Sequence, residues 1–368
     1  MGGANRAMLY LILELKKLGI DSEVVLPKTK ILPNDYLGNE LTRNNIKFYT
    51  EYYFFYRINC RNGLIRYLSN FVWYLKILWK LKGKKYSLIH SNSSFTDLGI
   101  WISIIKKIPH VWHLREYGNW GNSVPALGKS FDWFLASHTT KAIAISNAES
   151  LFYIPLFPKN RIKVIYDGVE PRNISDKYNK LLDNYDCQAN KYKFCIVGTL
   201  CDGKNQIMAI EAAGLLHSKR KDFEIYIIGS GEEYEKKLRK RAIELNIESI
   251  VKFLGEVNNV DYWLDQMQCG LMLTQNEAFG RVTIEYMLHA LPVIATDSGA
   301  NPEIIKNGET GIIVGQNDIP ALYHSMNFMM DNKLLTNIWG KEGKKRALNE
   351  FSSHSNAMAI KSLYESLI

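Results

Sequence analysis

The sequence predicts an α/β protein made of two Rossmann-like, doubly wound domains in tandem. Short apolar strand-like segments alternate with helix-length segments along the chain, which is the pattern of a parallel sheet. A polar stretch at 173–192 interrupts this alternation, and the pattern then begins again. A chain of 368 residues suits two domains of ordinary size.

In the first domain, a helix over 4–18 is expected to end at Gly19, because glycine commonly follows the last turn of a helix. Each expected strand is a short apolar run followed by polar residues or glycine. These strands lie at 21–27, 86–92, 110–114, 141–146 and 162–169.

The start of the chain resembles a loop that leads from a strand into a helix, with Gly2 and Gly3 at the turn. In a doubly wound domain the strand before such a loop is central, yet no residue precedes Met1 to form it. We therefore expect a gap in the first-domain sheet beside 22–27 and a poorly anchored Gly2–Gly3 loop. We also expect about eight residues of apolar strand before Met1 in a longer natural product.

The second domain repeats the strand–helix alternation. Its expected strands lie at 194–198, 223–229, 250–255, 269–274, 291–297 and 310–314. Because ligands bind outside the carboxyl ends of strands in such sheets, the loops after these strands should line one crevice.

Charge is divided unevenly along the chain. Residues 1–175 contain 24 lysines and arginines against 12 aspartates and glutamates, whereas the remaining residues contain 22 against 25. This basic half indicates an anionic partner, and without a nucleic-acid recognition motif we do not expect nucleic acid to be that partner. The five cysteines lack paired spacing, which is typical of reduced thiols in the cytoplasm.

The segment 48–87 combines aromatic and basic side chains. Its cations include Arg61, Arg66, Lys76, Lys80, Lys82, Lys84 and Lys85, and its aromatic residues include Tyr67, Phe71, Trp73, Tyr74 and Trp79. An amphipathic helix of this composition is suited to an anionic membrane surface. The alternative is a core helix with a solvated basic face.

Two glutamates, Glu277 and Glu285, flank the expected start of a helix, with Gly280 between them. Free N–H groups at a helix N-terminus favour phosphates and hydroxyl-rich ligands, and carboxylates bind sugar hydroxyls. The alternative is a pair of solvated charges at a helix end, and the two glutamates taken alone favour that alternative.

The residues around these glutamates, 276–314, resemble the E-x7-E region of the family 4 retaining glycosyltransferases, which have the GT-B fold. The similarity includes "GGANRAML", "VIYDGVE" and "VGTLCDGKNQ", so it covers nearly the whole chain. It implies a nucleotide-sugar donor and a lipid-linked or oligosaccharide acceptor, as in bacterial cell-surface polysaccharides such as capsule or lipopolysaccharide.

The resemblance also implies a division of the chain. Residues 1–172 would bind the acceptor, 173–192 would be the linker, and 193–349 would bind the nucleotide-sugar. The segment 350–368 would be a helix that returns to the first domain. Its apolar residues recur at helical spacing and predict a buried stripe: Ala357, Ile360, Leu363 and Leu367.

Roles follow from the resemblance by position. Glu277 would hold hydroxyls of the donor sugar, Glu285 the ribose and Lys204 the diphosphate, where a fixed cation stabilises the charge of the leaving group. The other donor-binding positions are Gly198, Thr199, Gly255, Ala278, Phe279, Gly280, Arg281 and Val282. Gly255 would lie near the base, although a plain turn glycine is the alternative. The acceptor or phosphate loop would comprise Gly2, Gly3, Asn5 and Arg6.

One position departs from the family pattern. An arginine often follows the glycine of the phosphate loop, and here that residue is Thr199. Arg281, at the first turn of the expected helix, stands where the family frequently has an aliphatic residue. We expect it to replace part of the missing charge.

His113 matches a family histidine near the donor sugar, so it is the second catalytic candidate beside Glu277. We expect it at a strand end that faces the crevice, with a carboxylate such as Glu116 holding the neutral ring. His90 and His110 are weaker candidates. No metal-ligand spacing is present, so we expect neither a metal nor a cofactor. The family mechanism, with front-face attack and retention, needs no protein nucleophile.

The sequence therefore predicts a glycosyltransferase on the inner face of the plasma membrane, cytoplasmic and peripheral. The alternatives are a sugar-nucleotide epimerase on the same fold and an inactive, truncated glycosyltransferase.

Overall fold

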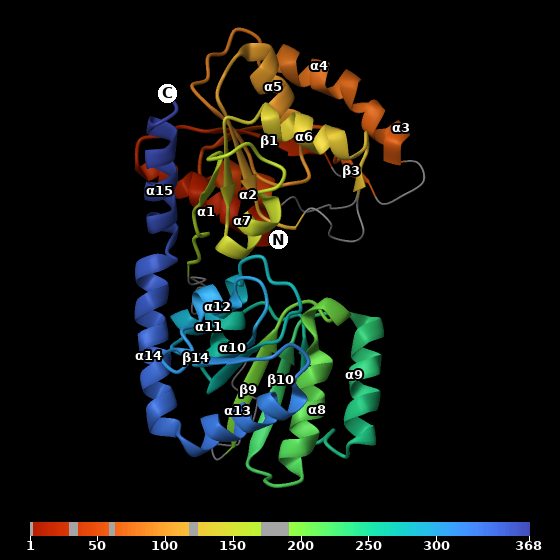
Figure 1. Cartoon of the computed structure of the whole chain (residues 1–368), viewed down its shortest axis with the longest axis vertical. Helices are drawn as coiled ribbons and strands as arrows, with labels where there is room; N and C mark the ends of the chain where they lie inside the picture. The colour runs from red at the N-terminus through yellow and green to blue at the C-terminus, as the bar shows by residue number, and fades with distance from the viewer. Residues whose placement is uncertain (1–2, 29–35, 59–62, 118–123, 171–190) are drawn as a thin grey trace. The chain divides into compact units, whose positions relative to one another are not determined.

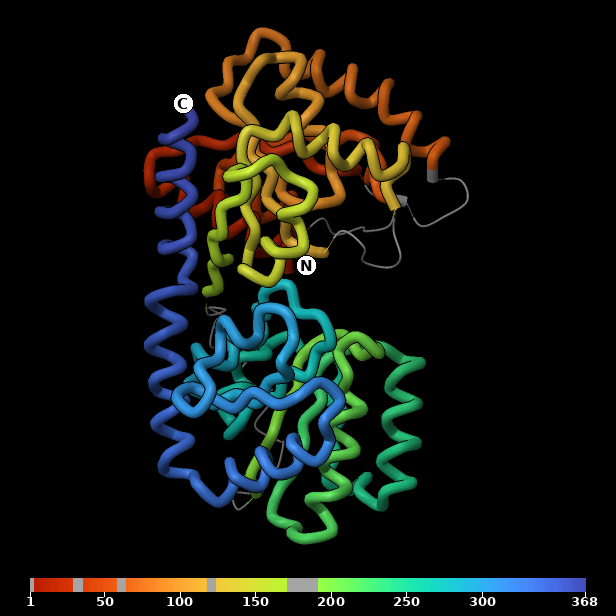
Figure 2. The backbone as a smooth tube through the Cα atoms, in the orientation of Figure 1, coloured from red at the N-terminus to blue at the C-terminus, as the bar shows by residue number. Residues whose placement is uncertain are grey.

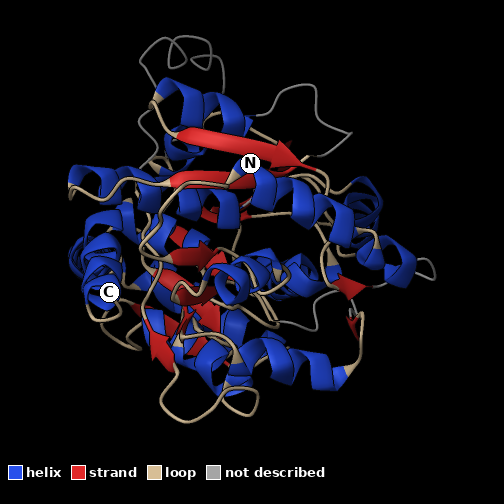
Figure 3. Ribbon diagram, turned by 90° about the horizontal axis from the view of Figure 1, so that it is seen from above, coloured by secondary structure: helices blue, strands red, loops and turns tan. Residues whose placement is uncertain are grey.

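The computed structural model describes residues 3–28, 36–58, 63–117, 124–170 and 191–368. The chain divides into two units (Figure 1). Unit 1 comprises Met1–Gly168 with Ser353–Ile368, and unit 2 comprises Val169–Ser352. Nearly all of the expected linker, 173–192, lies outside the described residues, and β9 begins at its last residue. Helices and strands alternate along the chain in both units, and Figure 3 distinguishes the helices from the strands by colour.

The sheet of unit 1 is in two parts. Strands β1 (Glu23–Pro27) and β2 (Lys47–Glu51) form a parallel pair, with Val24 opposite Phe48. A separate parallel sheet has the order β4 (Ile89–Ser91), β5 (His110–Leu114), β7 (Lys141–Ala144) and β8 (Ile162–Val164). Among the described residues no ladder joins β1 to β4, so the gap that the sequence predicted beside 22–27 is present.

Helix α1 (Gly3–Lys17) is followed, as expected, by Gly19. The φ of Gly19, 82°, lies in the left-handed region that glycine favours after the last turn of a helix. The N–H of Ile20 then donates to Leu15 O at 2.9 Å, which closes the last turn. Gly3 belongs to the helix, whereas Gly2 lies outside the described residues.

The C-terminal helix α15 (Ser353–Glu365) packs against α1 within unit 1, and Figure 2 traces the chain from α14 into it. Its predicted stripe is the contact surface: Ala357, Ile360 and Leu363 are buried in one core cluster, and Leu367 packs against its edge.

Helices cover the remaining faces of unit 1. They are α2 (Tyr36–Arg43), α3 (Gly63–Leu68), α4 (Asn70–Lys80), α5 (Leu98–Lys106), α6 (Lys129–Ser137) and α7 (Asn147–Tyr153). A short antiparallel pair joins β3 (Arg57–Ile58) to β6 (Val124–Pro125). The segment 48–87 is thus not one amphipathic helix, because it contains most of β2, then β3, and then two helices.

Unit 2 holds one parallel sheet of six strands in the order β11-β10-β9-β12-β13-β14. The strands are β9 (Tyr192–Val197), β10 (Phe223–Ile228), β11 (Val251–Gly255), β12 (Cys269–Met272), β13 (Val293–Thr296) and β14 (Gly311–Val314). Every residue of β10 is buried, as expected for a strand covered on both faces.

The sheet of unit 2 is covered by helices on both faces. These are α8 (Gln206–His217), α9 (Glu232–Glu244), α10 (Val260–Leu264), α11 (Arg281–Leu288), α12 (Asn301–Ile304), α13 (Ile319–Asp331) and α14 (Lys333–Glu350). The cysteines among the described residues, Cys195, Cys201 and Cys269, form no disulfide.

Candidate functional site

The strand order of unit 2 reverses between β9 and β12. The chain moves outward from β9 through β10 to β11, returns to the centre at β12, and then moves outward the other way. Loops that follow strands on either side of such a point diverge and leave a crevice, where ligands of doubly wound sheets bind. The predicted donor residues Lys204 and Glu277 follow β9 and β12 respectively.

The loop after β9 is short and internally braced. It passes through a 3₁₀ turn at Asp202–Lys204 and enters α8 after Asn205, which has a φ of 54°. The side-chain amide of Gln206 donates to Thr199 O at 3.0 Å. The N–H of Gln275 in the loop after β12 donates to Gly203 O at 3.1 Å, so the two loops are joined directly.

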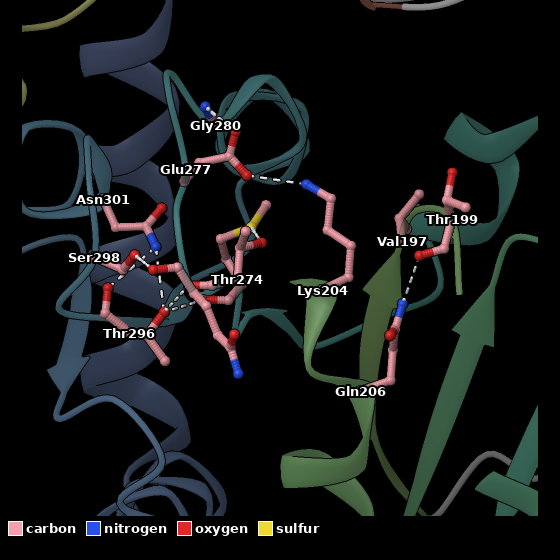
Figure 4. Close-up of polar contacts among 12 residues, drawn as sticks. Val197, Thr199, Lys204, Gln206, Thr274, Glu277, Gly280, Thr296, Ser298 and Asn301 are labelled. Carbon is pink, nitrogen blue, oxygen red and sulfur yellow. Dashed lines mark hydrogen bonds and ion pairs between the residues drawn. The ribbon is translucent and has the colours of Figure 1, made fainter. Parts of the chain in front are cut away.

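Glu277 is the centre of the polar contacts at this point (Figure 4). Its Oε2 lies 3.0 Å from Lys204 Nζ, and its Oε1 accepts the N–H of Gly280 at 3.0 Å. Gly280, with a φ of 86°, is the residue immediately before α11. One carboxylate therefore holds the loop at the start of α11 and balances the charge of the lysine from the neighbouring loop.

A third loop, after β13, supports Glu277 from behind. The N–H of Ala300 donates to Glu277 O at 2.9 Å, and the hydroxyl of Ser298 donates to Gln275 O. Gly299 has a φ of 53°, and a Cβ there would stand 2.0 Å from Glu277 O. The residue at 299 must therefore be glycine for the two loops to approach this closely.

Tyr286 fixes α11 against the centre of the sheet. Its hydroxyl accepts the N–H of Val197, the last residue of β9, at 2.8 Å. Gly270 on β12 leaves room for the ring, since a Cβ at 270 would lie 2.3 Å from it. Sequence reasoning did not select Tyr286, which is completely buried; the signal available in the sequence was a tyrosine directly after Glu285.

Apart from Gly255, the remaining predicted donor residues lie in the same three loops or in the first turns of α11. Thr199 is exposed, whereas Phe279 is buried and packs on Phe351 with 6.0 Å between ring centroids. Glu285 is buried on α11, and Arg281 is the first residue of that helix. Ala278 and Val282 are half-buried neighbours, and Gly198 leaves β9 with Lys204 methylenes 3.9 Å from its Cβ position.

A separate pocket of about 380 Å³ lies at the carboxyl ends of β10 and β11. It is lined by Ser230, Gly231, Glu232, Glu235, Lys236, Arg239 and Gly255. Gly255 therefore lines a cavity, and its role near a base stays a prediction.

His113 is placed differently from the expectation. It is the second-last residue of β5, as expected for a strand end, but its ring is completely buried and so does not face a crevice. Nδ1 lies 3.1 Å from His90 Nε2 and 3.3 Å from an Arg115 nitrogen. Asp167, rather than Glu116, is the carboxylate beside the ring, 3.7 Å from Nε2.

Burial lowers the pKa of His113 well below its ordinary value, and the charge of Arg115 lowers it further, so the ring is neutral. Arg115 itself is paired with Asp167. Whether His113 meets a ligand remains a prediction. Of the expected acceptor loop, Gly3, Asn5 and Arg6 form the first turn of α1, and the carbonyl of Ala4 accepts from Asn92.

Comparison with known proteins follows the same division of the chain. The family model described as "Glycosyltransferase Family 4" matches residues 1–173, and the model described as "Glycosyl transferases group 1" matches residues 176–346.

Two curated relatives illustrate the similarity. The Escherichia coli protein named UDP-Gal:alpha-D-GlcNAc-diphosphoundecaprenol alpha-1,3-galactosyltransferase is 25% identical, over 94% of this chain and 93% of its own. The capsular polysaccharide biosynthesis glycosyltransferase CapM of Staphylococcus aureus is 25% identical over 62% of each chain.

Solved structures share the fold over the full length. Anabaena Alr3699/HepE, determined in complex with UDP and glucose, aligns with a TM-score of 0.78 and 21% identity, covering all of this chain and 96% of its own. A glycosyltransferase from Rickettsia africae ESF-5 aligns with a TM-score of 0.81 and 19% identity, covering all of this chain and 95% of its own.

Proposed function

The chain belongs to the family 4 glycosyltransferases and has their GT-B fold, and on that premise we propose that it transfers a sugar, with retention, from a nucleotide-diphosphate-sugar to a lipid-linked or polysaccharide acceptor in cell-surface glycan synthesis. The observation that carries the proposal is the meeting of Lys204 and Glu277 at the switch point of the unit 2 sheet.

The donor diphosphate would take Lys204 away from Glu277. A phosphate oxygen that bonds the lysine ammonium neutralises charge that grows as the sugar–phosphate bond breaks. Glu277 Oε2 then becomes available to a sugar hydroxyl, while Oε1 keeps its bond to the Gly280 N–H. Glu285, further along α11, would take the ribose.

Sugar transfer itself would follow front-face attack. The acceptor hydroxyl attacks the anomeric carbon from the side of the departing diphosphate, and a phosphate oxygen of the leaving group accepts the hydroxyl proton. The glycosidic bond forms as the sugar–phosphate bond breaks, so the configuration is retained and no protein nucleophile takes part. His113 would act as a neutral group near the sugar.

We propose that this reaction needs no bound metal or cofactor. Lys204 and Arg281 would supply the positive charge opposite the diphosphate, and the N–H groups at the start of α11 would add partial positive charge. Arg281 would compensate for the absence of a cation at Thr199.

A lipid-linked acceptor is supported by the name of the Escherichia coli relative, whose acceptor is a diphosphoundecaprenol-linked sugar. None of the helices within the described residues combines the length and the apolar character that a membrane span requires. From the lipid-linked acceptor of that relative and the basic first half of this chain, we propose that the enzyme is cytoplasmic and works as a peripheral protein on an anionic membrane surface, with no nucleic-acid partner.

The test is a panel of radiolabelled nucleotide-sugars incubated with the purified chain and membranes. Label in the lipid or polysaccharide fraction, absent with Glu277→Gln, is expected from at least one donor. An isomerised donor without transfer would instead favour the epimerase, which the comparisons do not favour. No conversion of any donor would contradict the proposal.

A further inference from the structure

Helices α3 and α4 carry an apolar stripe on their solvent side. The two helices follow one another at the periphery of unit 1 (Figure 1). Their exposed apolar residues recur three or four positions apart: Leu64, Ile65, Leu68, Phe71, Val72, Leu75 and Trp79. Ile65, Phe71 and Trp79 are 72%, 70% and 75% exposed. A stripe of this kind normally faces a core, and here it faces outward.

The opposite side of these helices is held by polar contacts. The hydroxyls of Tyr67 and Tyr74 each donate to the buried carboxylate of Asp97 at 2.6 Å. Asn70 accepts the N–H of Phe54 and donates to its carbonyl, both at 2.8 Å. These bonds fix which face points inward, so the exposure of the stripe follows from the anchoring of the helices.

The segment that carries the stripe is rich in cations, of which Lys80 is paired with Glu51 and Lys84 with Glu23. From Tyr52 to Thr96 the sequence contains eight lysines and arginines and no aspartate or glutamate. Arg66, Lys76, Lys82 and Lys85 are exposed, and Lys76 Nζ lies 4.3 Å from the centroid of the Trp73 ring. A partner for this face must therefore be apolar at its centre and anionic at its rim.

We propose that the α3–α4 stripe inserts into the interface of an anionic lipid bilayer, with the neighbouring lysines and arginines on the headgroups. Amphipathic helices with this division bury their apolar face at the boundary of headgroups and acyl chains, and each nearby cation strengthens the attraction to anionic lipid. The contacts and charges alone indicate an apolar partner with an anionic rim. The choice of a membrane as that partner rests on the proposed function.

The experiment is co-sedimentation of the full chain with phosphatidylglycerol-containing vesicles and with phosphatidylcholine vesicles. Phe71→Ser/Trp79→Ser removes two exposed side chains, and Lys82→Gln/Lys85→Gln removes two exposed charges. The matched control is Leu334→Ser/Ile338→Ser, which removes two exposed apolar residues from α14 of unit 2. None of these residues is buried, so all variants should fold, and their melting temperatures are measured to verify this.

We expect binding to phosphatidylglycerol vesicles that is weak or absent with phosphatidylcholine. The aromatic double variant should bind at least about tenfold more weakly, and the charge variant should lose most of its dependence on anionic lipid. The control should bind like wild type. Equal binding by wild type and the aromatic variant would overturn the proposal, as would no binding by wild type.

A second copy of the chain is the competing occupant. A wild-type dimer that the aromatic variant converts to monomer, without vesicle binding by either, would assign the stripe to dimerisation and overturn the proposal. Sugar transfer to a water-soluble acceptor is measured separately. Vesicle binding without transfer would contradict the proposed function and leave the stripe assigned to lipid. Transfer without vesicle binding would support the proposed function and overturn the assignment of the stripe to lipid.

Discussion

Lys204 and Glu277 form an ion pair of 3.0 Å across the point where the strand order of unit 2 reverses. The lysine ends the short loop after β9, and the glutamate precedes α11 in the loop after β12. Their side chains are 34% and 15% exposed, so the pair is partly accessible to a ligand. A diphosphate that enters the site competes with a carboxylate for the same ammonium group.

Substitution of Glu277→Gln tests the role of this carboxylate. The amide oxygen of glutamine can still accept the Gly280 N–H, so the loop before α11 should keep its conformation. We expect turnover to fall at least about 100-fold, because a preorganised polar group at the reacting sugar is lost. The melting temperature should fall by less than about 4 °C, because a partly exposed ion pair contributes about 1 kcal/mol or less.

Glu309→Gln is the control for Glu277→Gln, since Glu309 lies in an exposed turn near Lys306 and away from the three loops. It should leave turnover and melting temperature unchanged. A large drop in the melting temperature of Glu277→Gln with little loss of turnover would make Glu277 a structural residue.

Substitution of Lys204→Met tests the diphosphate contact. Affinity for the preferred nucleoside diphosphate, measured by calorimetry, should fall about 10- to 100-fold, because a charge-assisted hydrogen bond is lost and Glu277 is left facing the phosphates. Lys204→Met/Glu277→Gln should bind the diphosphate more tightly than Lys204→Met alone, since the repulsion is removed. Failure of the second substitution to restore any affinity would contradict direct competition.

Lys237→Met provides the matched control. Lys237 lies on α9 and pairs at 3.0 Å with Asp202, which belongs to the same loop as Lys204. The side chain of Lys237 is exposed. We expect nucleotide affinity close to wild type, whereas a loss equal to that of Lys204→Met would indicate a general effect of positive charge.

Arg281→Ala tests whether the first residue of α11 replaces the missing cation at Thr199. We expect about tenfold weaker binding of the nucleoside diphosphate and little change for the nucleoside alone, because the guanidinium would contact phosphate rather than base. Unchanged diphosphate affinity would remove this role.

The strands of unit 2 could be predicted because each is a continuous apolar run followed by glycine or polar residues. The separation of β1–β2 from the β4–β5–β7–β8 sheet agrees with the gap that was predicted beside 22–27. Strand β2 was missed because the sequence "KFYTE" resembles the aromatic and basic segment that follows it. None of its residues is buried, so it lacks the apolar run that marks the other strands. Pairing with β1, rather than its own pattern, makes it a strand.

The candidate site could be predicted only in part. The topology rule brings the loops of Lys204 and Glu277 together, although the residues are far apart in sequence. Their direct contact depends on side-chain positions that Gly280, Gly299 and Tyr286 determine through close packing. The burial of His113 could not be predicted from the alternation of polar and apolar residues in "HVWHL". Every residue of β5 is buried, because both faces of the strand are covered.

Ile360→Ala tests the attachment of the C-terminal helix to unit 1. Ile360 is completely buried in a cluster with residues of α1 and β5, so truncation should reduce the free energy of unfolding by about 2–5 kcal/mol. Met358→Ala on the exposed side of α15 should have little effect. Equal melting temperatures for wild type and Ile360→Ala would contradict a structural role of this helix.

The buried histidines of unit 1 predict a loss of stability in acid. Burial lowers the pKa of His90 and of His110 to about 3, and it lowers the pKa of His113 well below the ordinary value. A histidine whose folded-state pKa is depressed stabilises the protein fully above its unfolded pKa of about 6.5, and that contribution is lost as pH falls toward the folded value. Each should remove up to about 1.4 kcal/mol per pH unit between about pH 6 and pH 4. Thermal melts across this range should show a falling melting temperature, with a shallower slope for His110→Asn, whose amide can take the place of Nδ1 beside Thr139 and carries no titrating group. His289 works in the opposite direction: burial alone would lower its pKa, but bonds to Asp261 and Asp265 raise it, so its contribution is present in acid and lost as pH rises. A slope in acid that is identical in wild type and His110→Asn would show that this buried histidine does not govern the transition.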